Sequence, residues 1–256
     1  MAFPNAYSLP IAVHVARKTK TTRSKPASSA RRFSPLRSVK RWFVVGILGV
    51  AVLLAVWVVS YKVINPPTTA YILSEKRYLG EIDRQWVDVD LIAPVMLRSV
   101  VAAEDANFCL HTGFDLDAIK TAIEAGANRG ASTITQQVVK NAFLWHGRNW
   151  GRKVLEALLT PVVELTWSKR RILEVYLNIA EFDEGIFGVH AAAWHYFGIG
   201  PESLSAQQAA SLAMVLPAPK ARSASNPSAS QRQRIALILD GAQLIAKDGR
   251  ATCFED

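Results

Sequence analysis

The longest uninterrupted apolar stretch of the chain lies near its N-terminus. Residues 42–61, WFVVGILGVAVLLAVWVVSY, contain no charged residue and show no polar face. Twenty such residues can cross the hydrocarbon core of a bilayer as a helix, and the terminal tryptophan and tyrosine suit its interfaces. A cleaved signal peptide is the alternative. The long basic leader and the lack of a small-residue cleavage site favour a single transmembrane anchor over 42–61.

From residue 91 onward, apolar positions recur at helical spacing. Pro94 suits a first turn, and an apolar stripe leads from it towards Glu104. Further helices are predicted over 115–126, 132–143, 151–167, 169–180, 187–197, 205–215 and 231–247. Pro161 is expected to kink the 151–167 helix or to mark its end.

The remaining segments show no helical spacing and no sustained strand alternation. Residues 66–90 are expected to form an irregular or short-strand connection, and residues 217–230 a Pro- and Ser-rich loop. Residues 62–256 therefore predict one mainly α domain, large enough for a single core.

The formal net charge of +9 comes from one segment. Residues 1–41 hold ten Lys and Arg and no Asp or Glu, which leaves 20 basic against 21 acidic residues over 42–256. By the positive-inside rule, 1–41 is a basic, disordered cytoplasmic tail, and 62–256 is exported. Because the exported part is near neutral, nucleic-acid binding is not expected.

The two cysteines, Cys109 and Cys253, are too few for a disulfide framework. We expect two free or buried thiols, although an oxidising compartment permits a bridge. Neither cysteine forms a C-x-x-C pair, and no histidine pair has zincin spacing, so a protein-built zinc site is not expected.

Residues 130–141, GASTITQQVVKN, carry an uncharged polar strip on a predicted helix. Thr133, Gln137 and Lys140 fall at i, i+4 and i+7 on one face. Ser132 is expected to cap the helix N-terminus. A solvated face usually carries several Lys and Glu, so a binding surface competes here with an ordinary capped surface helix.

Glu104 lies near the C-terminus of the predicted 91–104 helix, after its apolar stripe. Burial and the negative end of the helix dipole both disfavour its charge and raise its pKa, which suits a general acid or base near neutral pH. The charge of Asp105 is expected to raise that pKa further. Phe108, His111 and Gly113 complete the string, whose alternative interpretation is an ordinary polar helix end.

A cationic cluster follows at 148–156. Arg148, Arg152 and Glu156 share one helix face, and Lys153 reaches Glu156 at i+3. These cations exceed what one carboxylate needs and suit a phosphate or pyrophosphate. The alternative is a solvated helix with two salt bridges.

Four motifs together resemble one family. They are E-D-x-x-F-x-x-H-x-G at 104–113, G-x-S-T-I-T-Q-Q-x-x-K-N at 130–141, R-K-x-x-E at 152–156 and K-x-x-I-L-E-x-Y-L-N at 169–178. Their order is that of the family 51 glycosyltransferases, which polymerise the peptidoglycan precursor lipid II. The resemblance covers about 85–220. No Ser-x-x-Lys occurs, so a transpeptidase nucleophile is absent and the chain resembles the monofunctional biosynthetic form.

The resemblance implies a mainly α, lysozyme-like fold with a membrane-proximal jaw. It implies that Glu104 is the catalytic base that deprotonates the 4-hydroxyl of an acceptor N-acetylglucosamine. That oxygen would attack C1 of the donor N-acetylmuramic acid, and undecaprenyl pyrophosphate would leave. An α-linked donor would then give a β-1,4 bond with inversion.

The resemblance also assigns the other site residues. Glu156, the second catalytic glutamate, would orient cations or a divalent ion, and some members of the family use magnesium or manganese. The positions expected to bind pyrophosphate are Lys140, Arg148, Arg152 and Lys153. Those expected to contact other parts of the substrate are Asp105, Phe108, His111, Ser132, Thr133 and Gln137. His190 and Asp183 depart from the family pattern and carry no role.

Two other classes compete with this interpretation. A lysozyme-like hydrolase or lytic transglycosylase would also use an acidic glutamate, and a non-catalytic scaffold would bind glycan or partner enzymes. The expected partners of the favoured class are lipid II, the growing glycan strand, the membrane, and other cell-wall synthesis and division proteins. Its expected location is the bacterial inner membrane, with the catalytic domain periplasmic.

Overall fold

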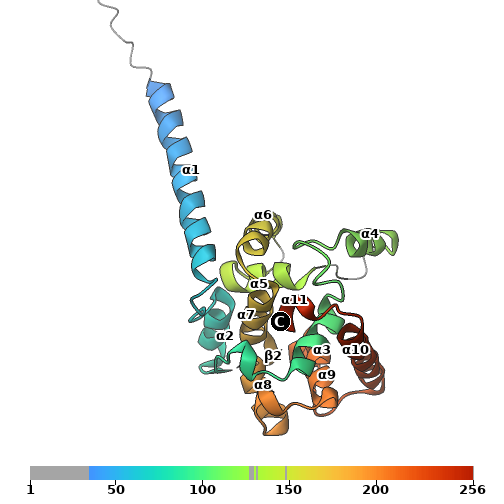
Figure 1. The fold of residues 1–256 in the computed structure, drawn as a ribbon. Coiled ribbons are helices and arrows are strands. Elements are labelled where there is room, and N and C mark those ends of the chain that lie inside the picture. The colour runs from blue at the N-terminus through green and yellow to red at the C-terminus, as the bar shows by residue number, and fades with distance from the viewer. Residues whose placement is uncertain (1–34, 127–129, 131, 148, 256) are drawn as a thin grey trace, which may run out of the picture. The chain divides into compact units, whose positions relative to one another are not determined.

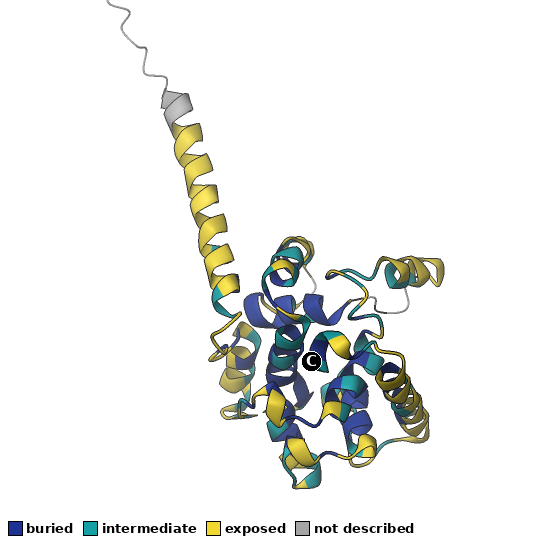
Figure 2. Ribbon diagram, viewed as in Figure 1, coloured by how far each residue is buried: buried dark blue, intermediate teal, exposed yellow. Residues whose placement is uncertain are grey.

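The computed structural model describes residues 35–126, 130, 132–147 and 149–255. The chain divides into two units, and the boundary along the sequence falls between Gly46 and Ile47. Helix α1 (Pro35–Ser60) contains a 22-residue stretch, Val39–Ser60, that is long and apolar enough to cross a membrane (Figure 1). Most of its described side chains are exposed (Figure 2). The helix begins before residue 42, so residues 35–41 of the predicted tail are helical; residues 1–34 lie outside the described part.

The mainly α fold class is confirmed. After α1 come α2 (Ala70–Leu79), the 3-10 turn η1 (Val89–Leu91), α3 (Pro94–Glu104), α4 (Leu116–Glu124), α5 (Ile134–Phe143), α6 (Trp150–Thr166), α7 (Lys169–Ile179), α8 (Val189–Phe197), η2 (Pro201–Ser203), α9 (Ala206–Val215), η3 (Pro219–Ala221), α10 (Ala229–Lys247) and α11 (Thr252–Glu255). The predicted helices from 91 to 247 all occur, with ends that differ by a few residues.

Three short strands form the sheet. They are β1 (Asp83–Arg84), β2 (Glu181–Asp183) and β3 (Ile186–Phe187), in the order β1-β3-β2. β1 runs parallel to β3, and β2 runs antiparallel to it. β1 lies in the segment 66–90, for which an irregular or short-strand connection was expected. β2 and β3 are too short to show alternation, which is why the sequence pattern did not reveal them.

The structure changes two expectations about helices. Helix α2 lies within 66–90, where no helix was predicted; Thr69 caps it by accepting a hydrogen bond from the Ile72 amide at 3.2 Å. Ile72 is its only buried residue, so the helix leaves almost no apolar pattern. Helix α6 continues through Pro161 to Thr166, so Pro161 does not mark its end, and the expected kink stays a prediction.

Two groups of helices build the core. α3 packs against α9 and α10, while α5 packs against α6 and α7 (Figure 1). The ends of α3 and α5 carry Glu104 and Gln137, which are joined by a hydrogen bond. The proposed base therefore lies where the two groups meet.

Cys109 and Cys253 form a disulfide, so the expectation of two free thiols was wrong. The two Cα atoms lie 5.7 Å apart although 144 positions separate them in the chain. Packing brings them together: the buried ring of Phe254 in α11 lies 6.4 Å from the Phe108 ring. The spacing of two cysteines in the sequence cannot predict that folding brings them this close.

Asn178, the last residue of the 169–178 motif, has a structural role at the end of α7. Its Oδ1 accepts from the Val87 amide at 2.8 Å, and its Nδ2 donates to the carbonyls of Val87 and Glu174, each at 2.8 Å. The side chain is fully buried. It fixes the connection that leads from the membrane helix to α3.

Asn178→Ala should lower the free energy of unfolding by about 2–4 kcal/mol, because it leaves the buried Val87 amide and carbonyl without their partner. Chemical denaturation of the full chain in detergent micelles, followed by tryptophan fluorescence, would measure this. Gln233→Ala, on the exposed side of α10, is the control and should stay within about 0.5 kcal/mol of wild type. An equal stability of the two variants would contradict the assignment.

Candidate active site

Glu104 is the last residue of α3, as the sequence predicted. Gln137, one turn into α5, donates from Nε2 to Glu104 Oε2 at 2.8 Å. The hydroxyl of the buried Tyr176 on α7 donates in turn to Gln137 Oε1 at 3.3 Å. These contacts set the orientation of the Gln137 amide, so that its NH₂ group faces the carboxylate.

Burial raises the pKa of Glu104 above its ordinary value of 4.5. The hydrogen bond from Gln137 opposes this rise, as do the charges of Arg234, Lys140 and Arg222. Desolvation outweighs these contacts, so the carboxylate is a stronger base than a solvated one. Asp105 was expected to raise the pKa of Glu104 further. Its carboxylate instead accepts hydrogen bonds from other groups, as described next.

Asp105 is fully engaged on the side of α5. Its Oδ2 accepts from the Ile134 amide at 3.0 Å, and its Oδ1 accepts from His111 Nε2 at 2.8 Å. The Gly113 amide donates to His111 Nδ1 at 3.2 Å, so the imidazole carries its proton on Nε2. Phe108 is fully buried. These three residues hold the loop in place and are not among the residues that line the cleft beside Glu104; their contacts with the substrate stay a prediction.

Thr133, and not Ser132, caps α5. Its hydroxyl oxygen accepts from the Gln136 amide and donates to the Gly113 carbonyl at 2.7 Å, and Gln136 completes a capping box. The T-x-x-Q spacing in the sequence is the signal that distinguishes the two candidates. Thr133 is 2% exposed and serves the fold, whereas Ser132 is exposed and lines the cleft.

A cleft of about 850 Å³ opens at Glu104. Its lining comes from the ends of α3 and α9, from the first turn of α5 and the residues before it, from the 217–230 loop and from α10: Ala103, Glu104, Gly130, Ser132, Gln137, Met214, Pro217, Arg222, Ser230, Gln231 and Arg234. Sequence reasoning missed Arg222 and Arg234. No local spacing marks them, because Arg234 reaches Glu104 only through the packing of α10 on α3, and Arg222 lies in the loop after η3.

These two arginines are held by backbone carbonyls. Arg222 Nη1 donates to the Met214 carbonyl at 2.7 Å, and Arg234 Nη2 donates to the Ala103 carbonyl at 2.9 Å. Their positive charge lowers the pKa of the Glu104 carboxyl. They thereby favour the ionised form of the carboxyl and oppose the effect of burial.

A second cavity, of about 230 Å³, shares Gln137 and Pro217 with the first and contains Lys140 and His146. Burial lowers the pKa of Lys140, and the charges of Arg152 and Lys153 act in the same direction. Glu156 and Glu104 oppose this. The pKa of Lys140 therefore responds to two carboxylates and to two further cations.

His146 closes the wall of this second cavity beside Tyr71. The two rings stack with centroids 3.6 Å apart and an angle of 8°. Burial, Lys140 and Arg152 lower the pKa of His146 to about 4, so the imidazole is neutral at pH 7. The Tyr71 hydroxyl donates a hydrogen bond to Glu181 Oε2. Sequence reasoning singled out none of these three residues.

Glu156 is buried on α6 and holds two cations. Arg152 Nη1 donates to Oε2 at 2.8 Å, and Lys153 Nζ donates to Oε1. The helix spacing predicted both pairs. Arg148, the fourth predicted cation, lies outside the described residues. Arg152 and Lys153 lie close enough to Lys140 to lower its pKa.

Comparison with known proteins gives one consistent match. A family model described as Transglycosylase matches residues 73–243. A biosynthetic peptidoglycan transglycosylase of Jannaschia sp. (strain CCS1) is 55% identical over 93% of this chain and 98% of the relative. The chain belongs to the transglycosylase family. Proteins with the same name from Rhodospirillum centenum and Rhizobium meliloti are 46% and 42% identical, each over 81% of this chain and 92% of their own length.

The transglycosylase resemblance admits a divalent metal, but the described donors do not fit one. Both carboxylate oxygens of Glu156 are taken by Arg152 and Lys153. The ligand atoms of Asp105, His111 and Asp115 lie within 4.8 Å of one another, yet all three side chains are engaged in hydrogen bonds to their own loop or to the first turns of α4 and α5. We therefore assign no metal ligand to either group.

Asp183 and His190, the two departures from the family pattern, lie outside both cavities. Asp183 Oδ2 accepts from the Tyr196 hydroxyl at 2.7 Å and lies 3.5 Å from His195 Nε2. It therefore belongs to the support of β2 and α8 in this transglycosylase.

Gln137→Leu should move the acidic limb of the kcat/KM–pH profile upward by about 0.5–1 pH unit. The substitution removes a hydrogen bond to the charged form of Glu104, so the pKa of that carboxyl, already raised by burial, rises further. Activity that needs the ionised form is then lost at a higher pH as acid is added. Initial rates across a pH series would show this, with the exposed Gln243→Leu as control. An unshifted limb in Gln137→Leu would refute the coupling.

Proposed function

We propose that the chain is a peptidoglycan glycosyltransferase that polymerises lipid II into β-1,4 glycan strands. The observation that carries this proposal is that Glu104 lines the larger cleft and is hydrogen-bonded by Gln137, which also lines the smaller cavity. The larger cleft offers room for a sugar acceptor beside the carboxylate. Next to it, Lys140, Arg152 and Lys153 provide the positive charge that a pyrophosphate leaving group needs.

Each group then has one task in the reaction. Glu104 takes the proton from the 4-hydroxyl of the acceptor N-acetylglucosamine, and that oxygen attacks C1 of the donor. The C1–oxygen bond to undecaprenyl pyrophosphate breaks on the opposite face, which inverts the anomeric centre. Raising the pKa of a carboxylate base brings it nearer to the operating pH, where proton transfer is most effective.

The cations stabilise the charge that develops on the leaving group. Burial is the largest cause that lowers the pKa of Lys140, and the charges of Arg152 and Lys153 lower it further, so these two cations repel the Lys140 ammonium. A bound pyrophosphate relieves this repulsion, and fixed cations require no reorganisation as its charge grows. Because Glu156 is occupied by Arg152 and Lys153, we propose that these side chains act here instead of a protein-bound magnesium or manganese ion.

The family and the apolar helix support a membrane location for this reaction. One N-terminal candidate span fits a single-pass membrane protein. We further propose that it lies in the bacterial inner membrane with the basic tail in the cytoplasm, by the positive-inside rule. The catalytic domain would then meet the lipid-linked substrate on the periplasmic side, together with other cell-wall synthesis and division proteins.

Glu104→Gln should reduce glycan synthesis from labelled lipid II by about 10²–10⁴-fold, because the amide keeps the shape of the side chain but cannot accept the proton. The assay uses the full chain in detergent micelles, with polymer separated from monomer by gel electrophoresis. Glu202→Gln, on the exposed η2 turn, is the matched control and should polymerise normally.

Substantial polymer from folded Glu104→Gln would refute the assignment of the base. A lysozyme-like hydrolase has no need for three cations beside its carboxylate, and it would clear purified sacculi without lipid II. Clearing of sacculi by the wild-type chain, without polymer formation, would favour that alternative over the proposed function.

A further inference from the structure

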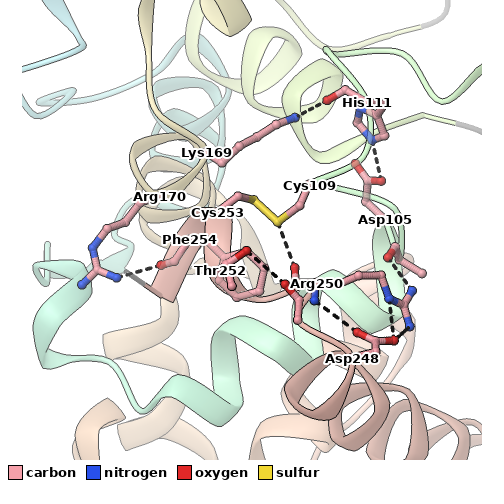
Figure 3. The surroundings of a disulfide bond; sticks show 12 residues. Asp105, Cys109, His111, Lys169, Arg170, Asp248, Arg250, Thr252, Cys253 and Phe254 are labelled. Atoms are coloured by element: carbon pink, nitrogen blue, oxygen red, sulfur yellow. Dashed lines mark hydrogen bonds and ion pairs between the residues drawn. A yellow bond between two sulfur atoms is a disulfide. The ribbon is translucent and has the colours of Figure 1, made fainter.

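The C-terminal segment 248–255 is fastened to the loop that directly follows Glu104. Figure 3 shows the two segments side by side, joined by the Cys109–Cys253 disulfide. The loop spans 105–113 and contains no regular helix or strand. Nothing in the proposed chemistry uses the disulfide directly, so its place beside this loop calls for a separate explanation.

Three contacts join the segment to the loop. The disulfide holds Cys109, and Arg250 Nη1 donates to the Ala106 carbonyl at 2.9 Å. The ring of Phe254 packs against the buried ring of Phe108. Ala106 lies only two positions after Glu104, so the arginine contact acts close to the base.

The segment itself is held from two sides, which makes it a firm support. Arg170 on α7 donates to the Phe254 carbonyl at 2.7 Å, and Arg98 on α3 pairs with Glu255 at 3.1 Å. Asp248 Oδ2 accepts from Arg250 Nε at 2.9 Å and aims the guanidinium (Figure 3). Arg98 lies on the same helix as Glu104, so the support and the base share one element.

The loop transmits this support to the site through Asp105. The Asp105 carboxylate joins the loop residue His111 to the first amide of α5. Helix α5 carries Gln137, which binds Glu104. A shift of the loop would therefore move the end of α3 relative to α5 and change the distance between the base and its hydrogen-bond donor.

We propose that Cys109, Cys253 and Arg250 are positioning residues for Glu104, which hold its loop in the catalytic arrangement from the C-terminal segment. The proposal rests on the proposed function for its kinetic readout. It predicts that loss of the disulfide changes the reaction itself and not only the stability of the chain. The disulfide also suits an exported domain, because such bonds persist in oxidising compartments.

The first experiment compares wild type with Cys109→Ser/Cys253→Ser in the full chain, below the melting temperature of both. We expect kcat for lipid II polymerisation to fall about tenfold with KM within twofold, since small misplacements of a base are costly. Leu204→Ala, a buried truncation in the turn before α9, is the control for lost stability and should keep its kcat.

A pH profile separates positioning from stability. The groups that face Glu104 are Gln137 and Lys140 from α5, Arg222 from the 217–230 loop and Arg234 from α10. All of them lower its pKa, and burial alone raises it. A loosened loop weakens the hydrogen bond from Gln137 to Glu104, so, as in Gln137→Leu, the acidic limb should move to higher pH in the double variant and stay in place in Leu204→Ala.

A dithiol reductant gives an independent test, because the chain has two cysteines in total. Reduction converts the protein disulfide to two thiols while the reductant forms its own disulfide. It should lower kcat of wild type to the level of the double variant and leave the double variant unchanged. Arg250→Met should give a smaller loss of kcat, about threefold, while the exposed Arg77→Met should give none.

Hydrogen exchange of residues 104–113 tests the same idea without any reaction. Faster exchange there in the double variant, but not in Leu204→Ala, supports the proposal even if lipid II polymerisation itself fails. A lower melting temperature with unchanged kcat, pH profile and exchange would overturn it and leave the disulfide a stabilising link only.

Discussion

The site depends on two neighbouring carboxylates at the end of α3, one bound within the fold and the other facing the cleft. Asp105 binds the first amide of α5 and the imidazole of His111, so its charge is satisfied within the fold. Glu104 faces the cleft, and among the described residues only Gln137 donates to it. One carboxylate thus joins the two helices, and this junction places the other in a partly desolvated position where its pKa rises. The position of Glu104 as a base therefore depends on the two hydrogen bonds that Asp105 accepts.

The surrounding charges balance this desolvation. Arg222 and Arg234 act on Glu104 from the larger cleft, and Lys140 acts from the smaller one. Lys140 is itself influenced by Glu156, whose carboxylate holds Arg152 and Lys153. The base and the anion-binding cations are therefore coupled through one lysine. Binding of a pyrophosphate would change the electrostatic environment of the base, which links occupation of the donor site to proton transfer at the acceptor.

Local spacing explains which parts of this site could be predicted from the sequence. The Arg152, Lys153 and Glu156 pairs follow from i+3 and i+4 positions on one helix, and the position of Glu104 follows from the end of an apolar stripe. Arg234 and the Cys109–Cys253 bond depend on how α10 and α11 pack against distant elements, and Arg222 lies in the loop after η3, so no periodicity marks them. Thr133 was assigned to the binding strip because its helical phase matches that of Gln137. Its role as a cap, which turns the hydroxyl inward, follows instead from its pairing with Gln136.

The central claim is that Glu104 is a buried base whose carboxylate is harder to ionise than a solvated one. Carboxyl ¹³C NMR of the glutamate-labelled chain in detergent micelles, titrated with acid, measures this directly. The Glu104 signal is identified by its loss in Glu104→Gln. The account predicts a titration midpoint above the ordinary value of 4.5. A midpoint at or below 4.5 would contradict it, because the carboxylate would then be solvated or neutralised too strongly to act as the base.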